Sequence, residues 1–417
     1  MTQLRSTSAL SMLVRRAATT RALLPAIDDL VAVERPTEPM HCLRPATIAA
    51  STRGFVAGFP GDVLYAVKCN PDPAVLAAVW AGGVRHFDCA SVAEVALVRE
   101  TFPDAAIHFM HPVKSRPAIR VAWEREGVRD FALDSASELA KIVAETDAAG
   151  ARADERGLFV RLALPKTGAV YDLSGKFGAP TEQAVALLRA ARPEAGRLGV
   201  CFHVGSQCLD PLAWRRALEL AGAVIRASGV TVDVVDVGGG FPVAYPDQIP
   251  PPLGAYFAEI KAAFEALGLP QDARLWAEPG RALVAAGASV VVQVELRRGD
   301  ALYVTDGVYG TLSDAGRPGF RFPTRLIRPD GPASAVEQLG FTLFGPTCDS
   351  ADVMRGPFEL PADTQEGDWI EIGQLGAYGA CLRTAFNGFD GLRRVEVRDP
   401  PMLNTPGHVE ADMALAA

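Results

Sequence analysis

The 417-residue sequence lacks the features that mark several common classes of protein. No uninterrupted apolar run reaches the roughly 18 residues that a membrane-spanning helix needs, so we expect no membrane association. Lysine and arginine form no long block and the formal net charge is -8, which leaves no basic surface for nucleic acid or anionic lipid. A hydrophobic content of 49% is instead typical of a globular protein with a large core.

Paired cysteine motifs are also missing. The seven cysteines are an odd number, are scattered, and show no CxxC spacing that would hold zinc or a redox pair; they are Cys42, Cys69, Cys89, Cys201, Cys208, Cys348 and Cys381. We therefore expect reduced thiols, no metal site and a cytoplasmic protein.

The first 27 residues contain no acidic residue and four arginines, and they are rich in Ser and Thr, as organelle targeting segments are. Leu10, Leu13 and Val14 also fit one apolar face of a helix, so an ordinary helical segment is the alternative. We treat residues 1–40 as a separate N-terminal segment with a helix and a strand that joins a later β domain.

Eight short apolar or β-rich runs recur between residues 60 and 280, and most intervals between them show helical periodicity. Eight such βα units predict a closed parallel barrel over residues 41–284. The eight runs are Val63–Val67, Arg85–Cys89, Ile107–Met110, Asp130–Leu133, Leu158–Leu164, Gly199–His203, Val234–Val237 and Leu275–Ala277.

The pattern changes after residue 285, where strand-like runs are separated by Gly, Pro and Asp turns without regular helices. This predicts a second, mainly antiparallel β domain over residues 285–417. We interpret the Pro- and Gly-rich stretch from Arg317 to Pro332 as a long irregular loop.

Several polar residues stand where the barrel strands end, and in a barrel these ends meet at one mouth. Lys68 ends the first run and Asp88 lies near the end of the second, while His203 and Ser206 lie at and after the end of the sixth. Burial at such a position should lower the pKa of Lys68 toward the neutral amine that can form an imine.

The last two runs are followed by groups suited to an anion. Gly239 and Gly240 leave room for backbone N–H groups to approach a phosphate, and Gly280 with Arg281 adds another glycine and a guanidinium. Glu278 could bind a protonated pyridine nitrogen.

Seven motifs occur in the order found in the fold-type III ornithine/lysine/diaminopimelate decarboxylase family, which the sequence resembles over about residues 40 to 400. They are Tyr65-Ala-Val-Lys-Cys-Asn70, Asp88-Cys-Ala-Ser91, His203-Val-Gly-Ser206, Asp236-Val-Gly-Gly-Gly-Phe-Pro242, Glu278-Pro-Gly-Arg281, Gly345-Pro-Thr-Cys-Asp-Ser350 and Gly376-Ala-Tyr-Gly379. The resemblance implies a (β/α)8 TIM barrel of the alanine-racemase type with a C-terminal β domain.

The resemblance also implies the cofactor pyridoxal 5'-phosphate (PLP), carried covalently by Lys68, with His203 stacked on its ring and Glu278 at its pyridine nitrogen. The phosphate-binding residues would be Ser206, Gly240, Gly280, Arg281 and Tyr378. We add Asp88 and Gly239 to this cofactor-binding set.

A homodimer with shared active sites follows from the same resemblance. Cys348 and Asp349 would come from the partner's β domain, Cys348 to protonate the substrate carbon after carbon dioxide leaves and Asp349 to bind the distal ammonium. An acid is needed at that carbon, and a carboxylate suits a cation.

The substrate is expected to be a basic amino acid. Ornithine or lysine is favoured because Asp349 after Cys348 resembles the ornithine/lysine branch of the family, whereas the diaminopimelate branch usually has Glu there. The segment after Asp306-Gly-Val-Tyr-Gly310 departs from the family pattern: Asp314 stands earlier than the family's second acid, and Arg317 stands near its place. Both are candidate substrate-binding residues. Diaminopimelate decarboxylase stays the nearest alternative, followed by decarboxylation of another amino acid, a racemase, and a non-catalytic regulator like the antizyme inhibitors.

Overall fold

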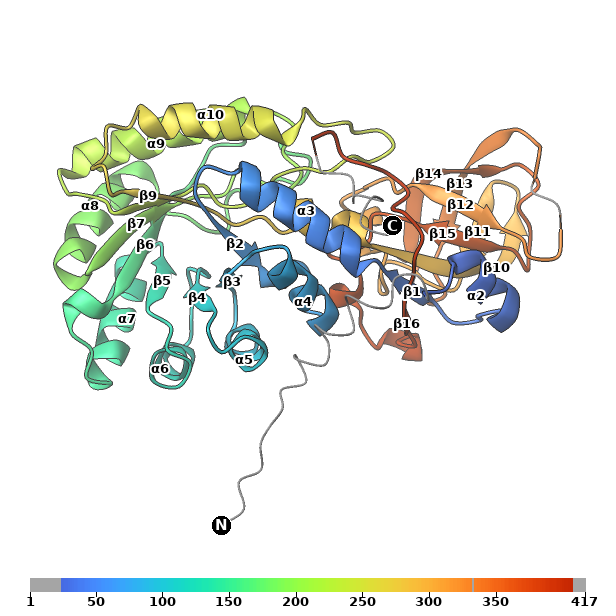
Figure 1. Ribbon diagram of the computed structural model, residues 1–417, viewed down its shortest axis with the longest axis horizontal. Coiled ribbons are helices and arrows are strands. Elements are labelled where there is room, and N and C mark those ends of the chain that lie inside the picture. The colour runs from blue at the N-terminus through green and yellow to red at the C-terminus, as the bar shows by residue number, and fades with distance from the viewer. Residues whose placement is uncertain (1–23, 332–333, 408–417) are drawn as a thin grey trace, which may run out of the picture.

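Eight parallel strands close into a barrel in the computed structural model, which describes residues 24–331 and 334–407 (Figure 1). The predicted barrel is thus confirmed, although the runs Leu158–Leu164 and Gly199–His203 extend past the observed strand ends. The strands, in barrel order, are β2 (Asp62–Ala66), β3 (His86–Cys89), β4 (Ala106–Phe109), β5 (Asp130–Leu133), β6 (Gly157–Arg161), β7 (Arg197–Cys201), β8 (Val234–Asp236) and β9 (Arg274–Ala277).

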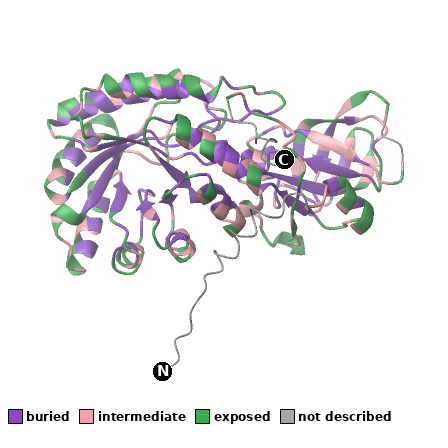
Figure 2. Cartoon of the chain, viewed as in Figure 1, coloured by how far each residue is buried: buried purple, intermediate pink, exposed green. Residues whose placement is uncertain are grey.

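Helices surround the barrel, and the longer ones combine buried with exposed residues, as the colouring of Figure 2 shows, whereas the short α11 is buried throughout. They are α3 (Pro45–Gly58), α4 (Pro73–Ala81), α5 (Val92–Thr101), α6 (Arg116–Glu124), α7 (Ala136–Ala148), α8 (Thr181–Ala191), α9 (Leu212–Ser228), α10 (Leu253–Glu265) and the short α11 (Arg281–Val284). Because strands buried on both sides need apolar residues at nearly every position, the barrel strands read as continuous apolar runs.

Side chains that precede the helices fix where they begin. Ser91 Oγ accepts a hydrogen bond from the N–H of Glu94 at 3.2 Å, and Ser135 Oγ accepts one from Glu138 at 3.3 Å. The carboxylate of Glu94 accepts from the N–H of Ala90, one residue before the cap. These contacts start α5 directly after β3, the strand that carries Asp88, and α7 directly after β5.

The second domain is one mixed sheet in which five of the seven strand pairs are antiparallel, so the mainly antiparallel prediction is confirmed. Its central order is β12-β15-β10-β11-β13-β14, with β1 beside β10 and β16 beside β1. The strands are β1 (Met40–Leu43), β10 (Ala288–Arg298), β11 (Ala301–Val304), β12 (Thr324–Ile327), β13 (Gln338–Phe344), β14 (Val353–Pro361), β15 (Trp369–Ile372) and β16 (Arg393–Glu396).

The interpretation of residues 317–332 as one irregular loop is wrong in part, because β12 lies inside it and pairs with β15. Thr324-Arg-Leu-Ile327 is a short strand-like run, and the prolines on either side of it hid that signal. Only the partner strand, more than 40 residues away, makes it a strand.

The helix α2 (Ile27–Glu34) and β1 both belong to the β-domain end of the molecule (Figure 1). Ile27 and Val31 of α2 pack in a small core with Val291 of β10 and Trp369 of β15. The strand β1 spans the predicted boundary at residue 40. The predicted apolar helix face at Leu10, Leu13 and Val14 lies outside the described residues, as does most of the candidate targeting segment.

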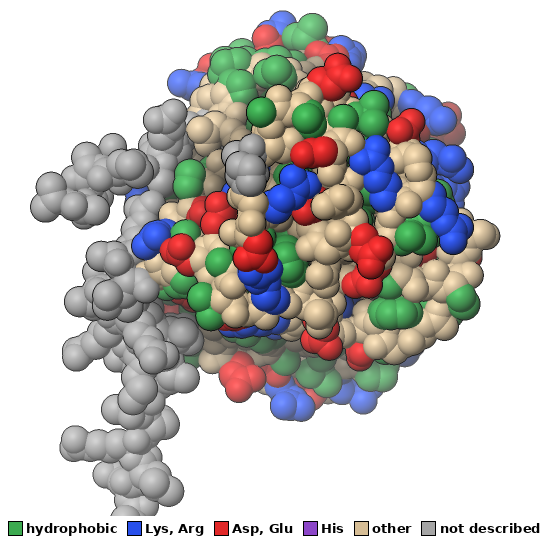
Figure 3. Space-filling view, turned by 90° about the vertical axis from the view of Figure 1, so that its right-hand side faces the viewer, with side chains coloured by type: hydrophobic (Ala, Val, Ile, Leu, Met, Phe, Trp, Pro, Cys, Tyr) green, Lys and Arg blue, Asp and Glu red, His purple; other side chains and the backbone are tan. Residues whose placement is uncertain are grey.

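Among the described residues, no helix is both long and apolar enough to cross a membrane. Figure 3 shows the β-domain end of the molecule, where acidic and basic side chains are intermixed over the visible face. That face therefore presents no continuous patch of one charge.

Candidate active site

Lys68 lies at the barrel mouth, in a 3₁₀ turn (Val67–Cys69) that directly follows β2. Its Nζ donates to Asp88 Oδ2 at 3.0 Å, because β2 and β3 pair in parallel with Ala66 opposite Asp88. Burial alone would lower the pKa of Lys68, but the charges of Asp88 and Glu278 outweigh it and the pKa is raised. The lowered pKa expected from the sequence is therefore wrong for this structure, in which the side chain is 41% exposed and pairs with the Asp88 carboxylate.

The glycines after β8 and β9 stand where no side chain fits. A Cβ on Gly239 would lie 2.6 Å from the carbonyl oxygen of Glu278, and one on Gly280 would lie 2.8 Å from Cβ of Cys69. Gly240 has φ +100° and would place a Cβ 2.3 Å from a backbone oxygen. The three glycines keep a cradle of backbone open next to Lys68.

Arg281 begins α11 beside these glycines, and its guanidinium is buried. Nη1 donates to the hydroxyl of Tyr245 at 2.8 Å, and Nη2 donates to Asp314 at 2.8 Å and to Ser206 at 3.4 Å. The ring of Tyr378 lies 5.0 Å from the guanidinium carbon. The structure thus brings Ser206, Arg281 and Tyr378 together, as the sequence predicted, and adds Tyr245.

The half-buried carboxyl group of Glu278, after β9, and the buried one of Asp236, at the end of β8, interact at the same mouth. Burial is the main reason that the pKa of Glu278 is raised well above its usual range, and the neighbouring Asp236 raises it further. Burial also raises the pKa of Asp236 to about 6. Asp236 Oδ2 has no hydrogen-bond partner among the described residues. Such a pair holds a proton until a positive charge is placed beside it.

His203 follows β7 and is neutral in this setting. Burial lowers the pKa of His203 to about 3, with further lowering by Arg161 and Lys68. Its Nδ1 accepts a hydrogen bond from the N–H of Gly205 at 3.0 Å. The ring is therefore fixed as an uncharged plane at the mouth, next to Gly239.

Cys348 and Asp349 lie in the β domain, in the turn between β13 and β14. The Cys348 side chain is exposed, and the N–H of Cys348 donates to Asn387 Oδ1 at 3.2 Å. The hydroxyl of Tyr309 donates to Asp349, and this bond is the main reason that the pKa of Asp349 is lowered. Among the described residues, no hydrogen bond or ion pair joins either one to Lys68 of the same chain.

Neither residue of the departing segment forms a hydrogen bond or an ion pair with Asp349 in the described structure. Asp314 is buried and forms an ion pair with Arg281, whereas Arg317 is exposed and forms no ion pair or hydrogen bond in the described structure. Their predicted role in substrate binding stays a prediction.

Three residues at the mouth were not singled out from the sequence: Asp236, Arg161 and Tyr245. Asp236 and Arg161 end barrel strands, and Lys68 directly follows one, so the position at a strand end could have identified both as residues of the barrel mouth. Tyr245 lies in a loop, and only its contact with Arg281 reveals it.

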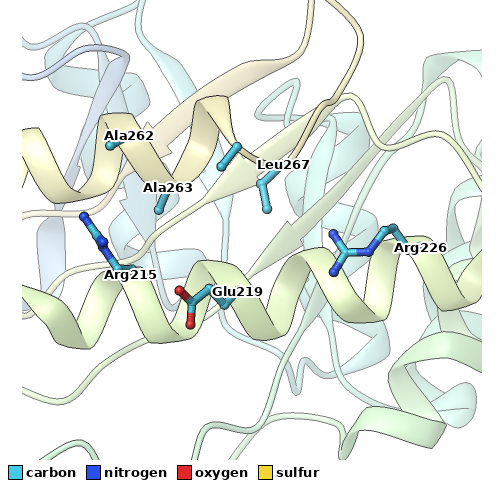
Figure 4. A pocket seen from close by; sticks show the side chains of 7 residues that line it. Arg215, Glu219, Arg226, Ala262, Ala263 and Leu267 are labelled. Atoms are coloured by element: carbon cyan, nitrogen blue, oxygen red, sulfur yellow. The ribbon is translucent and has the colours of Figure 1, made fainter.

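A separate groove on the outside of the barrel lies between α9 and α10 (Figure 4). Arg215, Glu219 and Arg226 line it from α9, opposite Ala262, Ala263 and Leu267. It contains no residue of the barrel mouth, so the strand-end cluster is the candidate active site.

The family model for the pyridoxal binding domain of pyridoxal-dependent decarboxylases matches residues 46–285. The chain belongs to this family. It is 32% identical over 349 residues to lysine/ornithine decarboxylase of Selenomonas ruminantium, a match that covers 81% of this chain and 84% of the relative.

Solved structures agree in fold. The arginine decarboxylase of Paramecium bursaria Chlorella virus bound to agmatine superposes with a TM-score of 0.78 at 26% identity, over 89% of this chain and 99% of that one. The lysine/ornithine decarboxylase of Vibrio vulnificus complexed with putrescine gives a TM-score of 0.74 at 30% identity, over 89% and 97% of the two chains. The protein is thus a PLP-dependent amino-acid decarboxylase.

The described residues fit this cofactor at both ends. The glycine cradle leaves backbone room at one end, where Arg281 Nε is a buried donor without an acceptor in the described structure. At the other end, the proton-holding pair of Glu278 and Asp236 suits a pyridinium nitrogen. Bound PLP supplies the electron sink that a decarboxylation needs.

Proposed function

We propose that this decarboxylase acts on a basic L-amino acid, ornithine or lysine, and forms putrescine or cadaverine for polyamine biosynthesis. The observation that carries the proposal is the charge of the pocket that holds Cys348 and Asp349. This pocket, of about 750 Å³, is lined by four carboxylates and by no lysine or arginine among the described residues; the carboxylates are Glu38, Glu295, Asp349 and Asp352.

An acidic lining favours a substrate whose far end carries an ammonium group. Asp349 is the carboxylate next to the thiol, and the bond from Tyr309 together with that from the N–H of Ala351 keeps it ionised. The relatives support this choice, since the Vibrio vulnificus enzyme is complexed with the diamine putrescine.

Each remaining residue has a role in this proposal. Lys68 carries the cofactor and is held by Asp88, His203 stacks on the ring, and Glu278 faces the ring nitrogen. Cys348 returns a proton to the substrate carbon, and Asp349 binds the distal ammonium. The phosphate is held by Ser206, Gly239, Gly240, Gly280, Arg281 and Tyr378.

The active site in this proposal is shared between two copies of the chain. Cys348 is exposed within its own chain, and Asn387, which bonds its backbone, lies between two exposed apolar side chains: Phe386 is 41% exposed and Phe389 47%. Phe389 lines the same pocket. A surface with apolar groups around a reactive thiol is what a protein interface would cover.

The substrate is tested by measuring carbon dioxide release from ornithine, lysine, arginine and diaminopimelate. Ornithine or lysine should give the highest kcat/KM. A preference for diaminopimelate would refute the basic-substrate assignment in favour of the family's other branch, and racemisation without carbon dioxide would refute decarboxylation itself.

The cofactor and the shared site are tested with two inactive variants. Wild-type protein should absorb near the visible edge in a band that borohydride bleaches, and Lys68→Ala should lack it. Mixing Lys68→Ala with Cys348→Ala should restore part of the activity, because a hybrid dimer contains one site with both residues intact. Complete subunit exchange without recovery would refute the shared site, and a regulator-like protein would show neither the band nor turnover.

We also propose a cytoplasmic location, which is supported by seven free cysteines, five of them buried. Fractionation of cells expressing the full chain with a C-terminal tag tests this, and recovery in an organelle would favour the targeting alternative for the N-terminal segment.

A further inference from the structure

The guanidinium of Arg281 is held from two opposite parts of the molecule. Tyr245, from the barrel loop after β8, accepts from Nη1, and Asp314, from the β-domain segment after β11, accepts from Nη2. Phe320 of the same segment lies 4.6 Å from the guanidinium carbon. Of the three guanidinium nitrogens, only Nε has no acceptor among the described residues.

Two buried glutamines hold the backbone of the two residues that precede Tyr245. Gln207 donates to the carbonyl of Val243 at 2.6 Å and accepts from its N–H at 3.1 Å, while Gln374 donates to the carbonyl of Ala244 at 2.8 Å. Both glutamines have positive φ, 56° and 60°, which few residues with side chains adopt. The structure thus holds the loop before Tyr245 rigidly from both domains.

Asp314 is fixed in the same way. It lies in a short 3₁₀ turn (Ser313–Ala315), its carbonyl accepts from the N–H of Phe320 at 2.9 Å, and its carboxylate is buried against Arg281. The segment that departs from the family pattern therefore packs against the arginine of the phosphate cradle.

We propose that Tyr245 and Asp314 are positioning residues that fix the Arg281 guanidinium for the phosphate of PLP, and that Asp314 serves this purpose instead of binding the substrate's distal ammonium. The inference rests on the PLP site proposed above. A guanidinium on a flexible chain loses conformational freedom when it binds a phosphate, and holding it beforehand removes that cost. Asp314 also balances the charge of an arginine that is buried before the phosphate arrives.

The test compares PLP with pyridoxal, which has the same ring and aldehyde but no phosphate. Dissociation constants for both are measured on cofactor-free wild type, Tyr245→Phe and Asp314→Asn by absorbance titration. We expect each variant to bind PLP about tenfold more weakly, which corresponds to about 1.4 kcal/mol, and to bind pyridoxal within about twofold of wild type.

Matched controls carry the same chemical changes elsewhere. Tyr256→Phe removes a hydroxyl that donates to the carbonyl of Leu209 in the outer layer of the barrel, and Asp368→Asn removes a buried carboxylate that pairs with Arg328 in the β domain. Both should leave the ratio of the two dissociation constants unchanged. Circular dichroism reports folding, and if Asp314→Asn does not fold, Tyr245→Phe decides the question because it removes a single oxygen.

Three results would overturn the inference. Equal weakening of PLP and pyridoxal would mean a general structural effect, and unchanged affinity for PLP would mean that Arg281 needs no such support. A higher KM for ornithine in Asp314→Asn at saturating PLP, with unaltered PLP affinity, would return Asp314 to substrate binding. Failure of the wild type to bind PLP at all would instead refute the proposed cofactor site.

Discussion

The buried carboxyl group of Asp236, which interacts with that of Glu278, should make the cofactor-free protein sensitive to pH in a predictable direction. Asp236 Oδ1 accepts from the N–H of Gly238 at 2.8 Å, but Oδ2 has no partner in the described structure and faces the cost of burial. Burial, the first cause, raises the pKa of Asp236 to about 6 from an ordinary 3.8. Ionising this group therefore costs more free energy in the folded state than in the unfolded state.

The size and sign of the effect follow from this difference. Below pH 3.8 the group is protonated in both states and contributes nothing, and between pH 3.8 and 6 the folded state progressively loses stability. Above pH 6 the loss is complete and amounts to roughly 3 kcal/mol, since a pKa difference of one corresponds to 1.36 kcal/mol. Asp236→Asn cannot ionise and keeps an oxygen for the N–H of Gly238, so it should avoid this loss.

The assay is urea unfolding of cofactor-free wild type and Asp236→Asn between pH 4 and 8. Tryptophan fluorescence follows the barrel, because Trp80, Trp123, Trp214 and Trp276 lie there and only Trp369 lies in the β domain. The free energy of unfolding of the variant minus that of wild type should rise by roughly 3 kcal/mol from pH 4 to pH 7. Two parallel curves across this range would refute the buried-carboxyl argument, whatever their offset.

Two further predictions concern the cofactor and the substrate. Gly239→Ala should weaken PLP binding by about tenfold or more. The new Cβ would lie 2.6 Å from the carbonyl oxygen of Glu278, and overpacking of this kind costs roughly 1–3 kcal/mol. The control is Gly254→Ala at the start of α10, where a Cβ meets nothing within 4 Å, and it should leave PLP titrations unchanged. Asp349→Asn should raise the KM for ornithine by about tenfold or more, since a hydrogen bond to a charged group is lost, while PLP affinity stays the same; an unaltered KM in steady-state assays would contradict its role.

Much of the site could be predicted from the sequence because its signals are local. Lys68, Asp88 and Glu278 stand at the ends of short buried strands, and parallel strands of a barrel bring those ends to one mouth. Gly239 and Gly280 could likewise be read directly, since a missing side chain beside an anion-binding turn is a property of the residue itself.

Other features depended on partners far away in the chain. The strand β12 was not recognised, because it exists only through its pairing with β15. A strand was expected in the N-terminal segment, but its bounds, Met40–Leu43, are set by pairing with β10. The position of Asp314 could not be read either, because its partner Arg281 belongs to the other domain.

The barrel, the order of its strands and the residue types at its mouth could be derived from the sequence alone, because burial on both faces and strand ends leave a pattern within a few residues. The charge states at the mouth depended on the folded arrangement. It raised the pKa of Lys68 beside Asp88 and Glu278, where burial alone would have lowered it, because a pKa is set by every charge and dipole that the fold places around a group.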